Sequence, residues 1–221
     1  MRPDDIPPAG VLLAAGAGVR FGRPKALVTF HGEPLVVRGV RLLACAGCRP
    51  VTVVVGADGV AVSAALCGRA VDVVVNDDWR SGMGGSVRAG LRAARRSDAP
   101  AAVVALVDQP LVAPEAVRRL MLSWRAGAVI AAATYDGHIR TPVLFDARTW
   151  DAVDQAVVGD QGARALLRDR PEWVEPVACD DVASPLDIDT GTDLSALTTE
   201  PDPNPPRVGG RAATKEQQQW N

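Results

Sequence analysis

The sequence has 221 residues and a formal net charge of −2, so it can bury one good core but offers no basic surface for nucleic acid or an anionic membrane. No apolar run approaches the roughly 20 residues that span a bilayer, and the first ten residues lack the pattern of a signal peptide. We therefore expect a cytoplasmic, single-domain protein without nucleic-acid or membrane partners.

The first predicted element is a short apolar strand that runs into a glycine-rich loop, LLAAGAGVRFGRPKAL, beginning at Leu12. Glycines let the backbone adopt positive φ and pass close to a bound group, and the arginines and lysine add positive charge. The glycines are Gly16, Gly18 and Gly22, and the cations are Arg20, Arg23 and Lys25. This combination indicates a site for a polyphosphate.

Lys25 stands out because the chain has 22 arginines but only two lysines. An ammonium group is a compact charge that reaches between phosphate oxygens, although a solvated loop residue is the alternative. Two common nucleotide motifs fit the loop badly. In a dinucleotide fingerprint the third glycine would come one residue earlier, and a Walker A loop would place Lys25 directly after glycine and before Ser or Thr.

The following elements alternate between helices and strands. Three continuous apolar runs are typical of strands buried on both faces, and the alternation predicts a parallel α/β sheet. Expected strands cover residues 51–56, 71–76, 101–108, 129–134, 143–145 and 172–179, with a strand and tight turn over 27–35 and a turn at DGHIRTP, residues 136–142. Expected helices cover residues 35–46, ended by Gly47, then 59–66 and 86–96, with one more beginning near Pro114 and a short one after residue 190.

Polar residues follow the strands of this sheet, where ligands of parallel sheets bind. Asp108 leaves a buried strand, and a divalent cation would compensate its charge there. Asn76 and Ser86 flank a glycine-rich segment and could hydrogen-bond a nucleobase, although Ser86 alone could be the N-cap of the next helix. In the segment D-I-D-T, Asp187 and Asp189 could both face one cation, or one could while the other anchors the backbone. The alternative is that Asp189 or Thr190 caps the next helix.

Two further features of the sequence, the cysteine pair and the C-terminal segment, predict a structural role and disorder rather than chemistry. Cys45 and Cys48 form a C-x-x-C at the end of a predicted helix without a second pair for zinc, so we expect reduced structural thiols. Residues 198–221 are rich in proline, glycine and charge, which predicts a disordered tail. The expected domain therefore spans residues 10–197, after an N-terminal tail of residues 1–9.

The ordered series of motifs L-A-A-G-x-G-x-R-x-G-x-P-K, N-x-x-W-x-x-G-x-x-x-S, D-Q-P, G-D-x-G-x-R and D-I-D-T resembles the nucleotidyltransferases related to the molybdenum cofactor cytidylyl- and guanylyltransferases. The resemblance implies a three-layer, Rossmann-like α/β fold of the glycosyltransferase A type with a mostly parallel central sheet. It implies catalytic roles for Lys25, Arg20 and Asp108, and Mg²⁺ held by Asp108 and Asp189. The implied nucleotide-binding residues are Leu13, Ala14, Ala15, Gly16, Gly18, Gly22, Lys25, Asn76, Gly82 and Ser86, and the implied acceptor-binding residues are Arg140, Asp160 and Gln161.

The resemblance also implies a reaction, in which CMP passes from CTP to the terminal phosphate of molybdopterin cofactor and pyrophosphate leaves. L-A-A-G, D-Q-P, G-D-Q-G and D-I-D-T favour CTP over GTP, and a molybdenum hydroxylase is a possible partner. The chain departs from the family pattern at Phe21, at GHIRTP and at Gly191. Alternatives are nucleotidyl transfer from GTP or another triphosphate to a sugar phosphate or cofactor precursor, a non-catalytic nucleotide or cofactor carrier, and a dinucleotide-dependent oxidoreductase.

Overall fold

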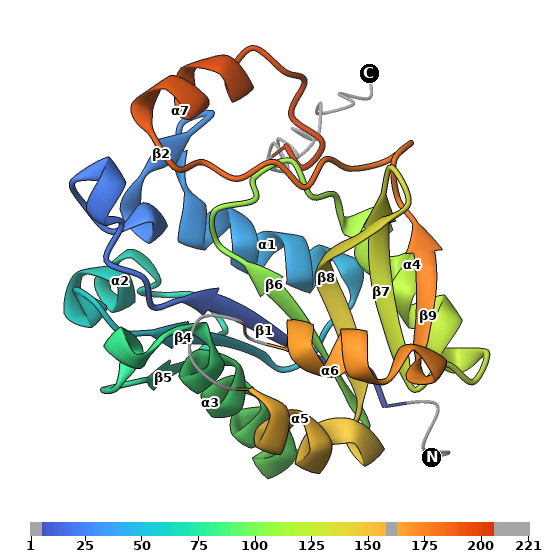
Figure 1. The fold of residues 1–221 in the computed structure, drawn as a ribbon. Coiled ribbons are helices and arrows are strands. Elements are labelled where there is room, and N and C mark those ends of the chain that lie inside the picture. Colours follow the sequence, from blue (N-terminus) through green and yellow to red (C-terminus); the bar gives the residue numbers. More distant parts are fainter. Residues whose placement is uncertain (1–5, 158–162, 206–221) are drawn as a thin grey trace, which may run out of the picture.

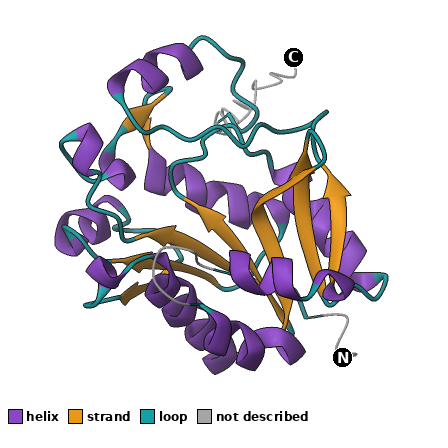
Figure 2. Ribbon diagram, viewed as in Figure 1, coloured by secondary structure: helices purple, strands orange, loops and turns teal. Residues whose placement is uncertain are grey.

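The computed structural model describes residues 6–157 and 163–205, and this part of the chain forms a seven-stranded sheet between two layers of helices (Figures 1 and 2). The strand order is β5-β4-β1-β6-β8-β7-β9. The strands are β1 (Ala9–Ala14), β4 (Val51–Val55), β5 (Asp72–Val75), β6 (Ala101–Leu106), β7 (Ile130–Tyr135), β8 (His138–Asp146) and β9 (Val174–Ala178). The expected three-layer α/β architecture is confirmed.

The sheet is mixed but mostly parallel, as expected. Strands β5, β4, β1 and β6 pair in parallel, with Leu12 opposite both Val53 and Ala105. Strand β8 runs antiparallel to β6 and β7, and β9 is parallel to β7. Because four neighbouring strands share one direction, their carboxyl ends meet at one edge, where parallel sheets bind ligands.

Each face of the sheet is covered by its own helices. Apolar side chains of β1 alternate between the two cores, since Leu12 belongs to one and Leu13 to the other. One core packs against α1 (Leu35–Ala46), α2 (Gly59–Ala65) and α4 (Pro114–Arg125), and the other against α3 (Met83–Arg96), α5 (Trp150–Ala156) and α6 (Arg164–Asp169). Helix α3 approaches β1 closely at Gly90, where an added Cβ would lie 2.2 Å from Val11 Cγ1.

A third, smaller core lies beyond the carboxyl edge of the sheet. It joins the hairpin of β2 (Thr29–Phe30) and β3 (Glu33–Pro34) to helix α7 (Gly191–Leu197) through buried side chains that include Phe30, Ile188 and Leu197. Single 3₁₀ turns complete the fold at η2 (Val19–Phe21), η3 (Lys25–Leu27), η4 (Trp79–Ser81), η5 (Ala147–Thr149) and η7 (Pro171–Trp173). This core therefore brings the D-I-D-T segment next to the glycine-rich loop.

The structure corrects two of the predicted elements. Strand β5 is an edge strand rather than a strand buried on both faces, and Val75 is 58% exposed. The turn expected at DGHIRTP is confined to Asp136 and Gly137, because His138–Asp146 forms strand β8. This strand pairs antiparallel with β7 on both sides of a register shift between Ala132 and Thr134. The predicted stop of α1 is confirmed by Gly47, whose φ of 103° is the left-handed conformation typical of a helix end.

The C-terminal segment also differs from the expected disordered tail. Residues 198–205 follow α7 and pack against α1, where Asp202 pairs with Arg38 and Asn204 is buried. Specific polar contacts order this segment, although its apolar content is low. Residues 206–221 lie outside the described residues.

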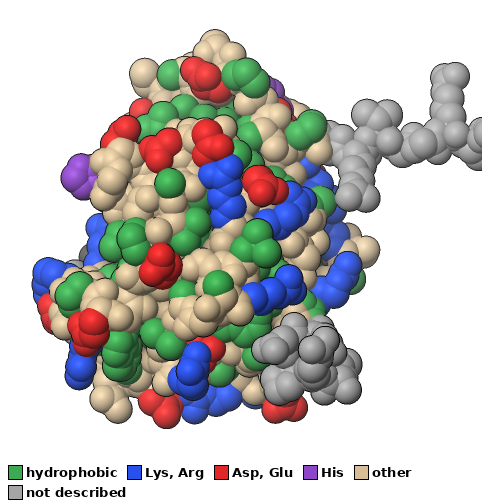
Figure 3. Space-filling model, turned by 90° about the vertical axis from the view of Figure 1, so that its right-hand side faces the viewer, with side chains coloured by type: hydrophobic (Ala, Val, Ile, Leu, Met, Phe, Trp, Pro, Cys, Tyr) green, Lys and Arg blue, Asp and Glu red, His purple; other side chains and the backbone are tan. Residues whose placement is uncertain are grey.

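The surface carries both signs of charge. Figure 3 shows acidic and basic side chains interspersed over the face on which β9 forms the sheet edge. Within residues 6–157 and 163–205, no helix combines the length and apolar character needed to cross a membrane.

Candidate active site

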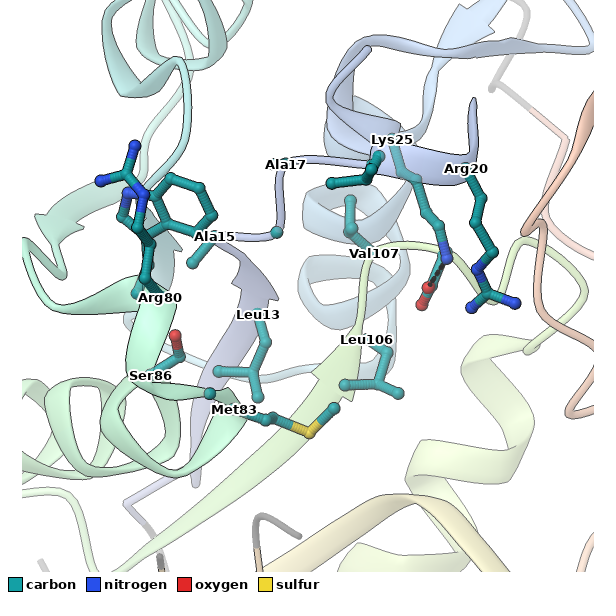
Figure 4. Close-up of a pocket in the computed structure, with 16 residues that line it drawn as sticks. Leu13, Ala15, Ala17, Arg20, Lys25, Arg80, Met83, Ser86, Leu106 and Val107 are labelled. Carbon is teal, nitrogen blue, oxygen red and sulfur yellow. Dashed lines mark hydrogen bonds and ion pairs between the residues drawn. The ribbon is translucent and has the colours of Figure 1, made fainter. Parts of the chain in front are cut away.

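A cavity of about 700 Å³ opens at the carboxyl edge of the sheet, between the loop after β1, the start of α3 and the end of β6. Figure 4 shows Lys25 and Arg20 on one side of it and Arg80 on the opposite side. Nine of the predicted site residues line this cavity: Leu13, Ala15, Gly16, Gly18, Arg20, Lys25, Gly82, Ser86 and Asp108. The cavity is large enough for a nucleotide.

The remaining predicted nucleotide residues, Ala14, Gly22 and Asn76, do not line the cavity. Ala14 is buried at the end of β1, and Gly22 closes the turn η2. Asn76 is buried behind the cavity wall. Ala14 and Asn76 therefore support the cavity from behind, whereas Gly22 is exposed in its turn.

The loop after β1 requires glycine at one position above all. Gly18 has φ 61°, and an added Cβ would lie 2.0 Å from the backbone carbonyl oxygen of Arg23. Because that atom belongs to the backbone, the loop cannot yield without moving residues 23–25. Gly22 also has positive φ, at 77°, but open space surrounds its missing Cβ. Gly18 therefore fixes the turn that brings Lys25 back toward the cavity.

Lys25 joins two aspartates that lie far apart in the sequence. Its Nζ donates hydrogen bonds to Asp108 Oδ2 at 2.7 Å and to Asp189 Oδ1 at 2.5 Å. Arg20 Nη2 lies 3.0 Å from Asp189 Oδ2. Partial burial works to lower the pKa of Lys25, but the hydrogen bonds and charges of the two aspartates outweigh burial and raise the pKa above its usual value. Lys25 is therefore a charged ammonium group at neutral pH.

The same geometry fits a divalent cation. The Asp108 and Asp189 carboxylates both contact the Lys25 ammonium, so they lie close enough together to share one small cation. Mg²⁺ is commonly held by one or two carboxylates while substrate phosphates and water complete its shell. Within the described residues, no group of three or more His, Cys, Asp or Glu side chains could hold a metal ion by itself. A cation here would therefore take the rest of its shell from water or from the oxygens of a bound ligand.

Asn76 and Ser86 meet as a buried pair. Asn76 Nδ2 donates to Ser86 Oγ at 3.0 Å, and the Ser86 side chain lines the cavity. Helix α3 begins at Met83, so Ser86 lies in its first turn and the N-cap interpretation is wrong. Gly85 allows this close packing, because an added Cβ would lie 3.2 Å from Asn76 Nδ2.

The wall opposite Lys25 contains residues that the sequence did not assign to the site. The Arg80 guanidinium lies 4.4 Å from the centre of the Trp79 ring, and both residues line the cavity. Trp79 packs so closely on Gly56 that an added Cβ there would lie 2.6 Å from Trp79 Cβ. The N-x-x-W pattern pointed to Trp79, but no local signal marks Arg80 or the apolar wall residues Met83, Leu106 and Val107.

A second cavity, of about 140 Å³, adjoins the first and shares Leu13, Met83 and Leu106 with it. Arg140 lines this cavity from β8, and Arg164 lines it from α6. Its wall also contains a polar chain in which Thr141 Oγ1 donates to Gln109 Oε1 at 2.6 Å and Gln109 Nε2 donates to the Pro185 carbonyl at 3.1 Å. The other two predicted acceptor residues, Asp160 and Gln161, lie outside the described residues.

The two aspartates of D-I-D-T face different surroundings. Asp189 contacts Lys25 and Arg20, whereas Asp187 lines the second cavity. Burial and the nearby Asp108 carboxylate raise the pKa of Asp187. Of the two predicted helix caps, Thr190 is confirmed, because its side chain accepts from the backbone N–H of Asp193, and Asp189 does not serve as the N-cap.

The cysteines lie away from these cavities and are all free thiols. Cys48 is fully buried, and burial raises its pKa to about 12. A thiol in this state is unreactive, which agrees with the expected structural role.

Residues 10–175 match the profile of the MobA-like NTP transferase domain. The chain belongs to this family. The match covers the glycine-rich loop, Asp108 and most of the sheet, and the part of the chain that carries Asp189 follows it. Structures of nucleotidyltransferases at 13–14% sequence identity, with TM-scores of 0.67 and 0.69, share the fold.

Two curated relatives carry different names. This MobA-like chain is 41% identical over 201 residues to nicotine blue oxidoreductase from Paenarthrobacter nicotinovorans. The alignment covers 86% of this chain and 96% of the relative. It is 32% identical over 161 residues to molybdenum cofactor guanylyltransferase from Rhodobacter capsulatus. That alignment covers 72% of this chain and 79% of the relative.

The structure is also similar to that of Rv0371c from Mycobacterium tuberculosis, with a TM-score of 0.77 and 29% identity, over 88% of this chain and 99% of that protein. A second structure of Rv0371c, in complex with manganese, matches with a TM-score of 0.70 over 86% of this chain and 97% of that protein.

Proposed function

We propose that this MobA-like protein transfers a nucleoside monophosphate from a nucleoside triphosphate to a phosphorylated acceptor and releases pyrophosphate. The observation that carries the proposal is the meeting of Lys25, Asp108 and Asp189 beside a glycine-lined cavity. In this arrangement one ammonium group and two carboxylates reach the same point, where the triphosphate of a bound nucleotide would lie.

The protein's residues bind and position the reactants. Backbone N–H groups of the loop around Gly16 and Gly18 receive phosphate oxygens, and Lys25 and Arg20 offset the charge that develops on the departing pyrophosphate. Asp108 and Asp189 hold the divalent cation, for which we propose Mg²⁺. When bound, this ion neutralises phosphate charge and fixes the geometry of the α-phosphate.

No protein nucleophile is needed for the proposed step. An oxygen of the acceptor phosphate forms a bond to the α-phosphorus of the nucleotide, while the bond from that phosphorus to the bridging oxygen of pyrophosphate breaks. The electron pair and the negative charge of the broken bond leave with pyrophosphate, next to Lys25 and Arg20. Catalysis then consists of in-line positioning and charge stabilisation.

We propose CTP as the nucleotide and molybdopterin cofactor as the acceptor. The L-A-A-G segment, with Ala15 on the cavity wall, supports the cytidine assignment, and the name of the Rhodobacter relative supports the acceptor. Because the same relative is named a guanylyltransferase, GTP is the principal competing nucleotide. Arg140 and Arg164 would receive an anionic group of the acceptor in the second cavity. A molybdenum hydroxylase would be the partner that takes the product.

The test is pyrophosphate release with CTP, GTP, ATP and UTP, each with molybdenum-loaded molybdopterin and with a panel of sugar phosphates. We expect release with CTP and molybdopterin, dependent on Mg²⁺ and stopped by a chelator. Release with GTP but not with CTP would identify GTP as the nucleotide. Release only with a sugar phosphate would identify a sugar phosphate as the acceptor. No release with any pair would reject nucleotidyl transfer.

A second candidate is an oxidoreductase, because the chain aligns with almost the whole of nicotine blue oxidoreductase at 41% identity. The largely apolar second cavity could receive a flat ring system. Incubation with nicotine blue and NADH or NADPH, followed at 340 nm, tests this candidate. Consumption of the reduced nicotinamide only when nicotine blue is present would favour the oxidoreductase over the transferase.

A further inference from the structure

Arg38 is a buried cation that follows three apolar residues in the first turn of α1. Its side chain is 3% exposed, and the guanidinium lies 4.9 Å from the centre of the Phe30 ring. A buried guanidinium is costly unless a carboxylate pairs with it and its other N–H groups find acceptors. The partner is Asp202, whose carboxylate accepts from Arg38 Nη1 at 2.9 Å and from Nη2 at 2.6 Å.

Asp202 comes from the segment after α7, and a second arginine of α1 fixes the same segment. Arg41 Nη1 donates to the backbone carbonyl and to Oδ1 of Asn204, and Arg41 Nη2 donates to Glu33 of β3 at 2.6 Å. Burial works to raise the pKa of Asp202, but the bonds from Arg38 and the Asn204 N–H hold the pKa below its usual value. Asp202 is therefore a charged partner at neutral pH.

Arg38 also contacts the loop that carries Asp108. Its Nη2 lies 3.3 Å from the carbonyl oxygen of Pro110, two residues after Asp108. The backbone of that loop is joined in turn to the D-I-D-T segment, because the Ile188 N–H donates to the Asp108 carbonyl at 2.8 Å. One guanidinium thus binds both the Asp108 loop and the chain that leaves the Asp189 segment.

Helix α7 needs such a restraint because it is short. It has seven residues, of which Leu197 is buried, and its first turn is held by the capping box between Thr190 and Asp193. Asp189 directly precedes this cap, so a shift of α7 would move the Asp189 carboxylate relative to Asp108. The Arg38–Asp202 pair restrains the chain five residues beyond the end of α7.

We propose that Arg38 and Asp202 are positioning residues that hold the Asp108 and Asp189 carboxylates at the separation needed to share one divalent cation. Neither residue touches the large cavity. The inference rests on the proposed metal-dependent function, but it concerns the placement of the two carboxylates and has a readout that is independent of turnover.

The experiment compares Mn²⁺ binding, followed by the electron paramagnetic resonance signal of the free ion, in wild type and Asp202→Asn. We expect the Mn²⁺ dissociation constant to rise roughly tenfold, at the low end of the loss seen when outer partners of metal ligands are removed. Hydrogen exchange of the α7 amides should accelerate in the same variant. Asp169→Asn is the matched control, because Asp169 forms an exposed ion pair with Arg168 and should leave both readouts unchanged.

A second variant keeps the inference testable if Asp202→Asn does not fold. Replacing a buried pair by apolar residues is often neutral for stability, so Arg38→Met combined with Asp202→Ala removes the restraint without leaving a lone charge. Wild-type Mn²⁺ affinity and unchanged α7 exchange in this folded double variant would overturn the proposal. Weaker Mn²⁺ binding in a protein that turns over no nucleotide would reject the proposed function but retain the positioning role.

Discussion

The two cavities at the carboxyl edge of the sheet are built in different ways. The large cavity is shaped by a glycine-rich backbone loop and by the closely joined charges of Lys25, Asp108 and Asp189. The smaller one is enclosed by side chains from separate strands and helices, with a polar chain through Gln109 and Thr141. The first site is thus organised by one backbone loop that meets two distant aspartates, whereas the second is formed by single side chains from several elements. We propose that the backbone loop of the first cavity sets nucleotide binding and that exchangeable side chains of the second set the choice of acceptor.

The largest effect is expected at the charged side of the large cavity. Asp108→Asn removes a carboxylate from the proposed cation and leaves Lys25 with one partner, so turnover should fall by about 10³-fold. Nucleotide affinity, measured by calorimetry with CTP and no acceptor, should fall much less. Equal turnover in wild type and Asp108→Asn would contradict the catalytic role of Asp108. A non-catalytic carrier would show no magnesium-dependent turnover in either protein.

The next effect tests the backbone of the same cavity. Gly18→Ala places a Cβ against the Arg23 carbonyl and should weaken CTP binding by more than about tenfold, because the loop must shift. Gly22→Ala is the matched control, since its φ is also positive but its Cβ meets open space. We expect Gly22→Ala to cost about 1 kcal/mol of stability and little affinity. Equal losses of affinity in both variants would show that the close contact at Gly18 does not shape the site.

A smaller effect is expected in the second cavity. Arg140→Gln removes a cation from its wall, so KM for the phosphorylated acceptor should rise about tenfold while KM for the nucleotide stays unchanged. Steady-state kinetics with each substrate varied in turn measures the two constants. A similar rise in both KM values would contradict the proposal that each cavity binds a different substrate.

The smallest effect on activity is expected at Asp146, which lines neither cavity. Burial works to raise the pKa of Asp146, but hydrogen bonds from Arg148 and from Trp124 Nε1 hold the pKa below its usual value. A carboxylate with a lowered folded pKa stabilises the protein above its unfolded pKa, near 3.9, and this stabilisation is lost as the pH falls through the folded pKa.

Asp146→Asn should therefore lower the free energy of unfolding by about 2 kcal/mol at pH 7 and by less below pH 4. Denaturant unfolding at several pH values measures the difference, and turnover at pH 7 should remain that of wild type. A constant difference down to pH 2 would contradict the assigned pKa direction.

The sequence could predict the parts of the site that belong to local motifs, but not the contacts between distant residues. The loop from Leu13 to Lys25 and Asp108 belong to motifs at strand ends, which a parallel sheet places at one edge. Asp189 also belongs to a local motif, but the third core brings it to that edge. The Gln109–Thr141 contact and the Arg38–Asp202 pair join residues 32 and 164 positions apart, and no periodicity marks them. They require the folded chain.

The individual errors have physical causes. Ser86 looked like an N-cap because Gly84 and Gly85 are poor helix formers, yet α3 includes both, and Asn76 packs closely against Gly85. The valines of β5 predicted burial, but an apolar run does not reveal which strand will be last in the sheet. Residues 198–205 lack apolar content, and their order comes from two arginines of α1.

The most direct test of the central claim is a crystal structure with Mn²⁺ and a non-hydrolysable CTP analogue, read by the anomalous signal of the metal. The account predicts one strong peak between the Asp108 and Asp189 carboxylates and the triphosphate, with Lys25 Nζ moved from the aspartates onto phosphate oxygens. A peak at another place, or a nucleotide bound while Lys25 still joins the two aspartates, would contradict it.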